Sequence, residues 1–249
     1  MSTSTTTIIG ITAPTSWIVA PNNMLTHPDI HRYGWKYQTD ARTIDENYMD
    51  LAYRIARNSY CMEGNMGSVF VRDIPLGSGH TIGSVTTRGT VIAQSINSAL
   101  VKRFHSECHA EANAVSACCR HGISLAGTTC YVTRAPCTNC YRLIATAGVI
   151  RIVCPQDPAS EECLESVAKL GIEWIKIRQT QDQMQTRDEE ASKHEDNDRV
   201  QLLRQERKLV REQEKVRSRK RKAQKLLEMQ QKQEDKQLEK EKKQRKQRN

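Results

Sequence analysis

The chain has 249 residues and a formal net charge of +9, and only 5% of its residues are aromatic. The basic excess lies mainly in residues 180–249, which hold 22 Lys and Arg against 15 Asp and Glu and contain no Gly, Pro, Cys or aromatic residue. Such a segment buries too little apolar surface to offset the entropy of ordering a core of its own. No run approaches the roughly 20 apolar residues of a membrane-spanning helix. We therefore expect one folded domain within the first 180 residues.

The number of cysteines and the position of the first basic residue indicate in which cellular compartment the protein is expected. All nine cysteines fall between Cys61 and Cys163, and an odd number argues against a complete disulfide framework. The first basic residue is Arg32, so the charged start of a secretory signal is missing. We expect a soluble protein of a reducing compartment, the cytoplasm. The basic run at 217–222, "RSRKRK", adds the nucleus as an alternative.

The first predicted element is a helix. Residues 1–42 show no steady periodicity and are expected to form a loosely ordered N-terminal extension. Thr43 and Glu46 have the spacing of a capping box, and apolar residues then recur on one helical face. This pattern predicts a helix over 44–58.

Strands and further helices follow. Two segments rich in Val and Ile predict strands at 68–73 and 90–96, and a long Gly- and Ser-containing loop joins them. Beyond them, the sequence predicts helices over 109–120, 137–148 and 160–171 and strands over 128–133, 149–154 and 172–178. Two adjacent strands followed by alternating helices and strands indicate an α/β fold, a mixed sheet with helices on both faces.

Two short strings, "CHAEANAV" at 108–115 and "PCTNC" at 136–140, are the candidate site. Each stands at the start of a predicted helix, where the helix dipole favours thiolate over thiol. Cys137 and Cys140 share a helix face, and with His109 they make three ligands that suit Zn²⁺. Three protein ligands leave a fourth position for water, which is typical of one catalytic zinc ion rather than a structural one.

Glu111 completes the pattern as the candidate catalytic residue. A carboxylate beside water activated by a metal can accept its proton and deliver it elsewhere. His-x-Glu followed by Pro-Cys-x-x-Cys is the signature of zinc-dependent nucleobase deaminases. Either string alone also fits an ordinary reduced core, but their joint occurrence favours a deaminase.

The stretch "GTTCYVTRAPCTNCYRLIATAGVIRIV", together with "CHAEANAV", resembles the deoxycytidylate (dCMP-type) deaminases of the zinc-dependent cytidine deaminase superfamily. The resemblance runs from about Asp45 to Ile177. It implies a three-layer α/β/α fold with a five-stranded mixed sheet, and hydrolysis of dCMP to dUMP and ammonia. The roles it implies are zinc ligation by His109, Cys137 and Cys140, proton transfer by Glu111, sugar binding by Asn97, and base contacts by the backbone of Ala110 and Ala135.

These inferences divide the chain into an extension (1–42), a deaminase domain (43–178) and a charged tail (179–249). Two other functions stay open. The first is a deaminase acting on adenosine or cytidine in tRNA, although "APC" stands where tRNA deaminases have Glu-Pro-Cys. The second is an inactive zinc module that binds partners. We expect a homo-oligomer with a small nucleotide as its substrate.

The tail has an imperfect heptad pattern. Leu202, Leu209, Val216 and Ala223 are seven residues apart, but the complementary positions are mostly polar. This pattern fits a single helix, a disordered tail or a dimerising coiled coil. Its basic residues predict a polyanion or a protein as partner.

Overall fold

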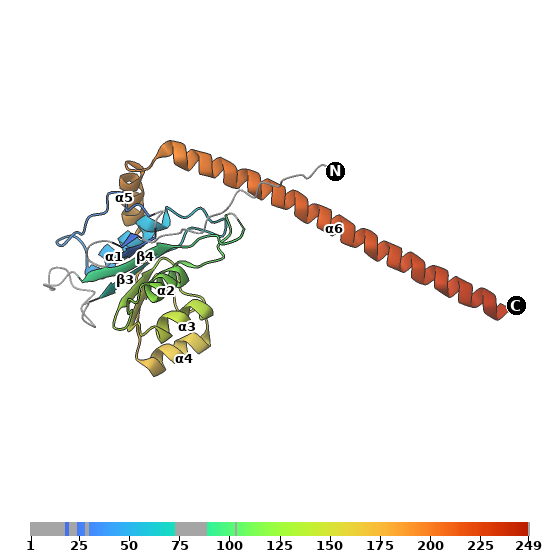
Figure 1. The fold of residues 1–249 in the computed structure, drawn as a ribbon, viewed down its shortest axis with the longest axis horizontal. Helices are drawn as coiled ribbons and strands as arrows, with labels where there is room; N and C mark the ends of the chain where they lie inside the picture. Colours follow the sequence, from blue (N-terminus) through green and yellow to red (C-terminus); the bar gives the residue numbers. More distant parts are fainter. Residues whose placement is uncertain (1–17, 20–23, 28–29, 73–88, 103, 249) are drawn as a thin grey trace, which may run out of the picture. The chain divides into compact units, whose positions relative to one another are not determined.

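The computed structural model describes residues 18–19, 24–27, 30–72, 89–102 and 104–248. The chain forms two compact units, residues 1–196 and 197–249. The first is an α/β domain and the second is one long helix, α6 (Asn197–Arg248) (Figure 1). None of the helices in the described ranges combines the length and the apolar character needed to cross a bilayer.

One mixed sheet forms the centre of the domain. Its seven strands, in spatial order, are β1 (Ile18–Val19), β2 (Leu25–Thr26), β4 (Thr90–Ile96), β3 (Gly67–Arg72), β5 (Thr129–Val132), β6 (Arg151–Cys154) and β7 (Glu173–Lys176). Strand β3 pairs antiparallel with β4 and β5, whereas β5, β6 and β7 are parallel. The mixed sheet is confirmed, but its predicted count of five strands was wrong. The N-terminal segment adds two short strands at the β4 edge, where Leu25 is fully buried and pairs with Ala93.

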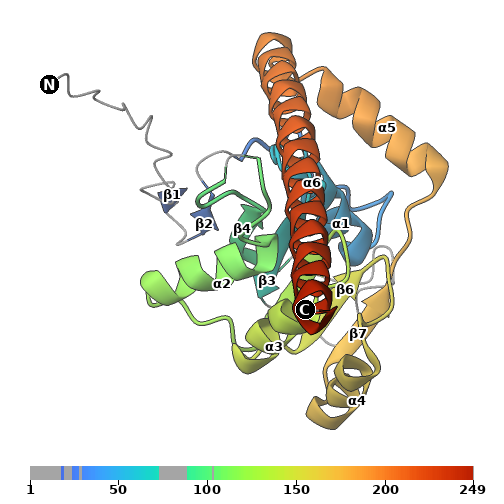
Figure 2. The ribbon, with the colours of Figure 1, turned by 90° about the vertical axis from the view of Figure 1, so that its right-hand side faces the viewer.

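Helices cover both faces of the sheet, which confirms the three-layer α/β/α fold. On one face lies α1 (Ile44–Ala56); on the other lie α2 (Ala110–Arg120), α3 (Thr138–Thr146) and α4 (Glu161–Leu170) (Figures 1 and 2). Alternate strand residues serve the two faces, as the pleat requires. Val69 and Tyr131 pack in the α1 cluster, whereas Phe70 and Cys130 pack with α2 and α3.

The helices and strands predicted beyond residue 42 are all present, with ends that differ by up to two residues. The capping box of α1 is confirmed: the Thr43 hydroxyl accepts the Glu46 N–H at 3.2 Å, and the Glu46 carboxylate accepts the Thr43 N–H at 2.9 Å. The predicted loop over 74–88 lies outside the described residues.

Two segments outside the predicted domain of 43–178 pack against α1. In the N-terminal segment, the Trp35 indole N–H donates to the Asn47 carbonyl at 3.2 Å, so residues near Trp35 are docked rather than loosely ordered. On the C-terminal side, α5 (Gln181–Ser192) places Ala191 in a fully buried position. There, Arg54 of α1 donates to the Glu190 carboxylate at 2.5 Å.

Candidate active site

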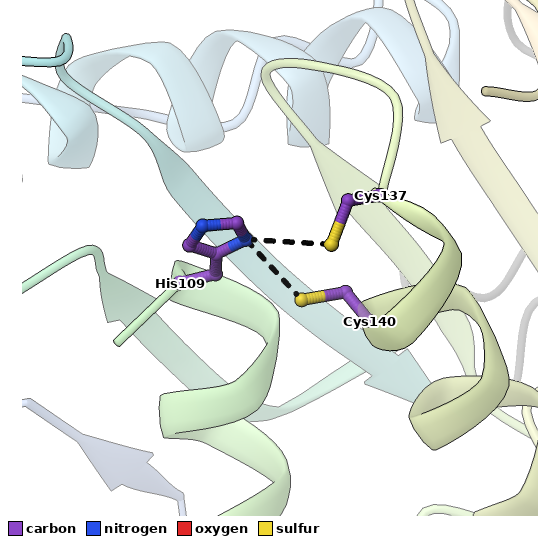
Figure 3. A group of neighbouring side chains, drawn as sticks. All are labelled: His109, Cys137 and Cys140. Atoms are coloured by element: carbon purple, nitrogen blue, oxygen red, sulfur yellow. Dashed lines mark hydrogen bonds between the residues drawn. The ribbon is translucent and has the colours of Figure 1, made fainter. Parts of the chain in front are cut away.

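Three side chains with metal-ligating atoms meet where α2 and α3 begin. His109 and Cys137 are the N-cap residues of these helices, and Cys140 lies in the first turn of α3. The His109 Nδ1 atom is 3.6 Å from Cys137 Sγ and 3.5 Å from Cys140 Sγ (Figure 3). The structure therefore brings together the three residues that were predicted to bind zinc.

The spacing of these atoms fits a tetrahedral zinc ion. With Zn–S bonds of about 2.3 Å and a Zn–N bond of about 2.1 Å, a tetrahedral angle sets nitrogen and sulfur about 3.6 Å apart. Both observed nitrogen–sulfur distances match that value, and all three ligand atoms lie within 4.8 Å of one another. His109, Cys137 and Cys140 can therefore hold one ion without rearrangement of the backbone.

Burial changes the expected electrostatics of one thiol. The sequence predicted that the helix N-terminus would favour thiolate, and the Ala112 backbone N–H does point to Cys140 Sγ and lowers its pKa. Burial outweighs this contact and, with the nearby charge of Glu111, raises the pKa of the Cys140 thiol. A cation is thus the stronger means of deprotonating Cys140, since coordination to a metal removes the thiol proton outright.

Glu111 is a buried carboxyl group beside this cluster. It lies in the first turn of α2, on the same helix as Ala110, and only 5% of it is exposed. Burial raises the pKa of Glu111, while its own backbone N–H and the nearby His109 oppose the shift. Burial thus makes the carboxylate a stronger base, which suits a group that accepts a proton and passes it on.

A cavity of about 570 Å³ opens over the cluster. Its described lining is Glu63, Met66, Ser106, His109, Glu111, Val132, Arg134, Ala135, Cys137, Gln156, Asp157 and Ala159. This volume is within the usual range for small-ligand sites. His109, Glu111 and Cys137 therefore face one space that can hold a small molecule.

The three residues predicted to bind substrate have different surroundings. Ala135 lines the cavity, and its N–H donates to the Gln156 side chain at 3.1 Å. Ala110 is fully buried, and its carbonyl accepts a hydrogen bond from the Ser95 hydroxyl. Asn97 is not among the described residues that line the cavity.

The Asn97 side chain instead holds the cavity wall together. It donates to the Gly64 carbonyl and the Ser106 hydroxyl, both at 2.9 Å, and accepts the Met66 N–H at 2.9 Å. Only 1% of Asn97 is exposed. Its hydrogen bonds position Met66 and Ser106, which do line the cavity. A direct contact between Asn97 and a sugar stays a prediction.

Most of the residues that form the wall of the cavity were not predicted from the sequence. Glu63 accepts hydrogen bonds from the Ser106 N–H and from the His105 ring, both at 2.9 Å. Gln156 ties the loop after β6 to the loop before α3. These residues lie in loops that carry no periodic pattern or motif, so only the three-dimensional arrangement identifies them.

Comparison with known proteins gives a consistent result. Residues 42–156 match the family model described as the cytidine and deoxycytidylate deaminase zinc-binding region. The deoxycytidylate deaminase of Mycobacterium phage D29 is 34% identical over 123 residues, which cover 45% of this chain and 94% of the phage protein. ComE operon protein 2 of Bacillus subtilis is 26% identical over 53% of this chain and 71% of its own length.

Among solved structures, the dCMP deaminase from the cyanophage S-TIM5, crystallised with dCMP and dUMP, aligns with a TM-score of 0.43 and 22% identity. That alignment covers 54% of this chain and 96% of the phage chain. The family-model match contains His109, Cys137 and Cys140, and the match to the D29 enzyme covers nearly the whole of that protein. The chain therefore belongs to the deoxycytidylate deaminase family of the cytidine deaminase superfamily.

Proposed function

We propose that this protein is a zinc-dependent hydrolase that converts dCMP and water to dUMP and ammonia. The observation that carries the proposal is the position of Glu111, a buried carboxyl group that lines the same cavity as His109 and Cys137 of the zinc-compatible cluster. The family of the chain and its likeness to a phage deoxycytidylate deaminase support a cytosine nucleotide as substrate.

In this proposal His109, Cys137 and Cys140 hold one zinc ion. Zinc would lower the pKa of a bound water molecule to about 7, which supplies a nucleophile at neutral pH. The protein residues provide the remaining chemistry. Burial of Cys140 and Glu111 limits the access of bulk water, so hydrogen bonds and charges act more strongly here than in solvent.

Glu111 is the proton carrier of the proposed reaction. It accepts a proton from the attacking water as the oxygen bonds to C4 of the base. It delivers this proton to N3 of the ring. It then takes the remaining proton from the new hydroxyl group on C4 and passes it to the amino group, so that the C4–N bond breaks, ammonia leaves and the C4 carbonyl of dUMP forms. Because Glu111 is not a zinc ligand in this arrangement, its role in proton transfer can be separated from metal binding.

Ala135 and Gln156 are proposed to position the substrate from the cavity wall. The Gln156 side chain fixes the Ala135 backbone, which leaves one edge of the cavity with a defined shape. Arg134, Glu63 and Asp157 bring charges of both signs to the lining, so the cavity is suited to a polar ligand.

A substrate panel tests the proposal. Purified zinc-loaded protein is assayed for ammonia release from dCMP, CMP, dCTP, deoxycytidine and tRNA. We expect the highest kcat/KM on dCMP. Release from tRNA alone would favour the RNA deaminase, and no release from any substrate by protein with full zinc content would favour the inactive zinc module.

A further inference from the structure

Helix α6 carries a large excess of positive charge. Over its 52 residues it holds 20 Lys and Arg against 9 Asp and Glu. The charge is uneven, because the 13 residues from 215 to 227 contain seven basic residues and no acidic one. Every residue of this stretch is exposed. We name residues 215–227 the basic segment.

Most of the Lys and Arg residues of this segment form no ion pair within the protein. Lys215 forms an ion pair with Glu212 at 2.7 Å. The other six Lys and Arg residues of the segment, from Arg217 to Lys225, form no ion pair with any residue of the described chain. Their charges are therefore available to an external anion.

The spacing of these charges matches that of a nucleic acid strand. At about 1.5 Å of rise per residue, the basic segment is roughly 20 Å long and presents one cation about every 3 Å. Each strand of duplex DNA carries one phosphate per about 3.4 Å of helix axis. A rigid helix with this charge density can meet several consecutive phosphates without a change in its own conformation.

Most of the basic residues and most of the apolar residues lie on different sides of the helix, although Leu226 falls among the basic residues. Successive residues of an α-helix are about 100° apart around its axis. Six of the seven Lys and Arg residues of the basic segment therefore fall within an arc of roughly 200°. Val216, Ala223 and Leu227 share a stripe on the opposite side, which continues through Leu202 and Leu209. The basic arc can therefore contact a polyanion while this stripe faces away from it.

The composition of α6 favours a duplex over the other polyanionic surfaces. The helix contains no aromatic residue, so it lacks the side chains on which single-stranded bases stack. Its apolar stripe is interrupted by Glu206, Gln213 and Lys220, which is unfavourable for insertion into a lipid surface. We propose that the basic segment binds the phosphate backbone of duplex nucleic acid, without reading its sequence.

The test compares two triple variants of the full-length protein, with a labelled 30-base-pair DNA duplex of mixed sequence as the probe. The first variant is Arg217→Gln, Arg219→Gln and Arg221→Gln. The matched control is Arg204→Gln, Arg207→Gln and Arg211→Gln, which removes the same charge from the part of α6 where acids are interleaved. Circular dichroism verifies that both variants keep their helix content.

At about 0.15 M salt, we expect the first variant to weaken binding about tenfold or more and the control less than threefold. The slope of log affinity against log salt should fall by about 2 to 3 in the first variant, since each lost phosphate contact removes about 0.9. Absence of binding by the unmodified protein, or equal weakening by the two variants, would overturn the proposal. Tighter binding to anionic phosphatidylserine vesicles than to the duplex would also overturn it, in favour of a membrane surface.

Discussion

Arg151 and Asp45 lie 106 residues apart in the chain, yet their side chains form a double hydrogen bond with neither side chain exposed. The two contacts measure 2.6 and 2.5 Å, and the Tyr131 hydroxyl donates to the same carboxylate at 2.8 Å. This pair ties α1 to β6 across the interior of the domain. Arg151 also donates to the Glu173 carboxylate at 2.8 Å, so removal of Asp45 would leave the buried arginine with this one acidic partner.

Asp45→Ala is therefore expected to lower the free energy of unfolding by up to about 3–5 kcal/mol, with Glu173 offsetting part of the loss. Urea denaturation of the zinc-loaded protein measures the change. Glu162→Gln is the matched control, because it breaks an ion pair with Arg142 in which both side chains are more than half exposed. Exposed pairs contribute little, so the control should unfold close to the unmodified protein. A similar loss of unfolding free energy in the two variants would show that the buried pair stabilises the fold no more than an exposed pair does.

The metal cluster predicts a second result. Cys137→Ser should lose bound zinc, because two remaining protein ligands hold the ion too weakly. Cys119→Ser is the control, since Cys119 is an exposed cysteine of α2 outside the cluster. Zinc per chain, measured by elemental analysis after dialysis, should approach zero in the first variant and stay near one in the control. Full zinc content in Cys137→Ser would contradict the three-ligand site.

Gln156 supplies a third prediction. Its side chain accepts the Ala135 N–H at 3.1 Å, and both residues line the cavity. Gln156→Ala should lower kcat/KM on dCMP by about two- to tenfold, the equivalent of one hydrogen bond of about 0.5–1.5 kcal/mol. Gln156→Glu keeps the acceptor oxygen and should restore most of the activity. Equal losses in the two variants, with zinc intact, would show that this hydrogen bond does not position the loop.

The contact between Arg54 and Glu190 leads to a fourth prediction. A chain that ends after residue 196 keeps this 2.5 Å pair, whereas one that ends after residue 180 loses all of α5 and exposes the site of Ala191. We expect the longer chain to melt near the full-length protein and to retain dCMP turnover. The shorter chain should melt several degrees lower, since about 1 kcal/mol corresponds to about 2–4 °C at this size. Equal melting temperatures for the two truncated chains would deny α5 a structural role.

The sequence predicted the regular elements well because local signals and tertiary packing agree. Thr43 and Glu46 form the capping box that their spacing indicates, and Leu51 and Ile55 of the predicted helical face are buried. The docked position of Trp35 was missed, because the segment around it has no periodicity and is held by a hydrogen bond to Asn47 of another element.

Only the motif residues of the candidate site could be predicted from the sequence. His109, Glu111, Cys137 and Cys140 belong to two motifs of fixed spacing. In the structure the first three line one cavity, and Cys140 lies beside His109 and Cys137 in the metal-compatible cluster. The walls come from loops that meet only after folding. Ser106 and Met66, for example, are joined through the buried side chain of Asn97.

We propose that Glu111 transfers protons in the deamination of dCMP at a zinc site of which it is not a ligand. The most direct test measures dUMP formation from dCMP by the unmodified protein and by Glu111→Gln at equal zinc content. Glutamine fills nearly the same volume but cannot accept and return a proton, so zinc should stay near one per chain while kcat falls at least about 10²-fold. Near-normal dUMP formation by zinc-loaded Glu111→Gln would contradict the claim.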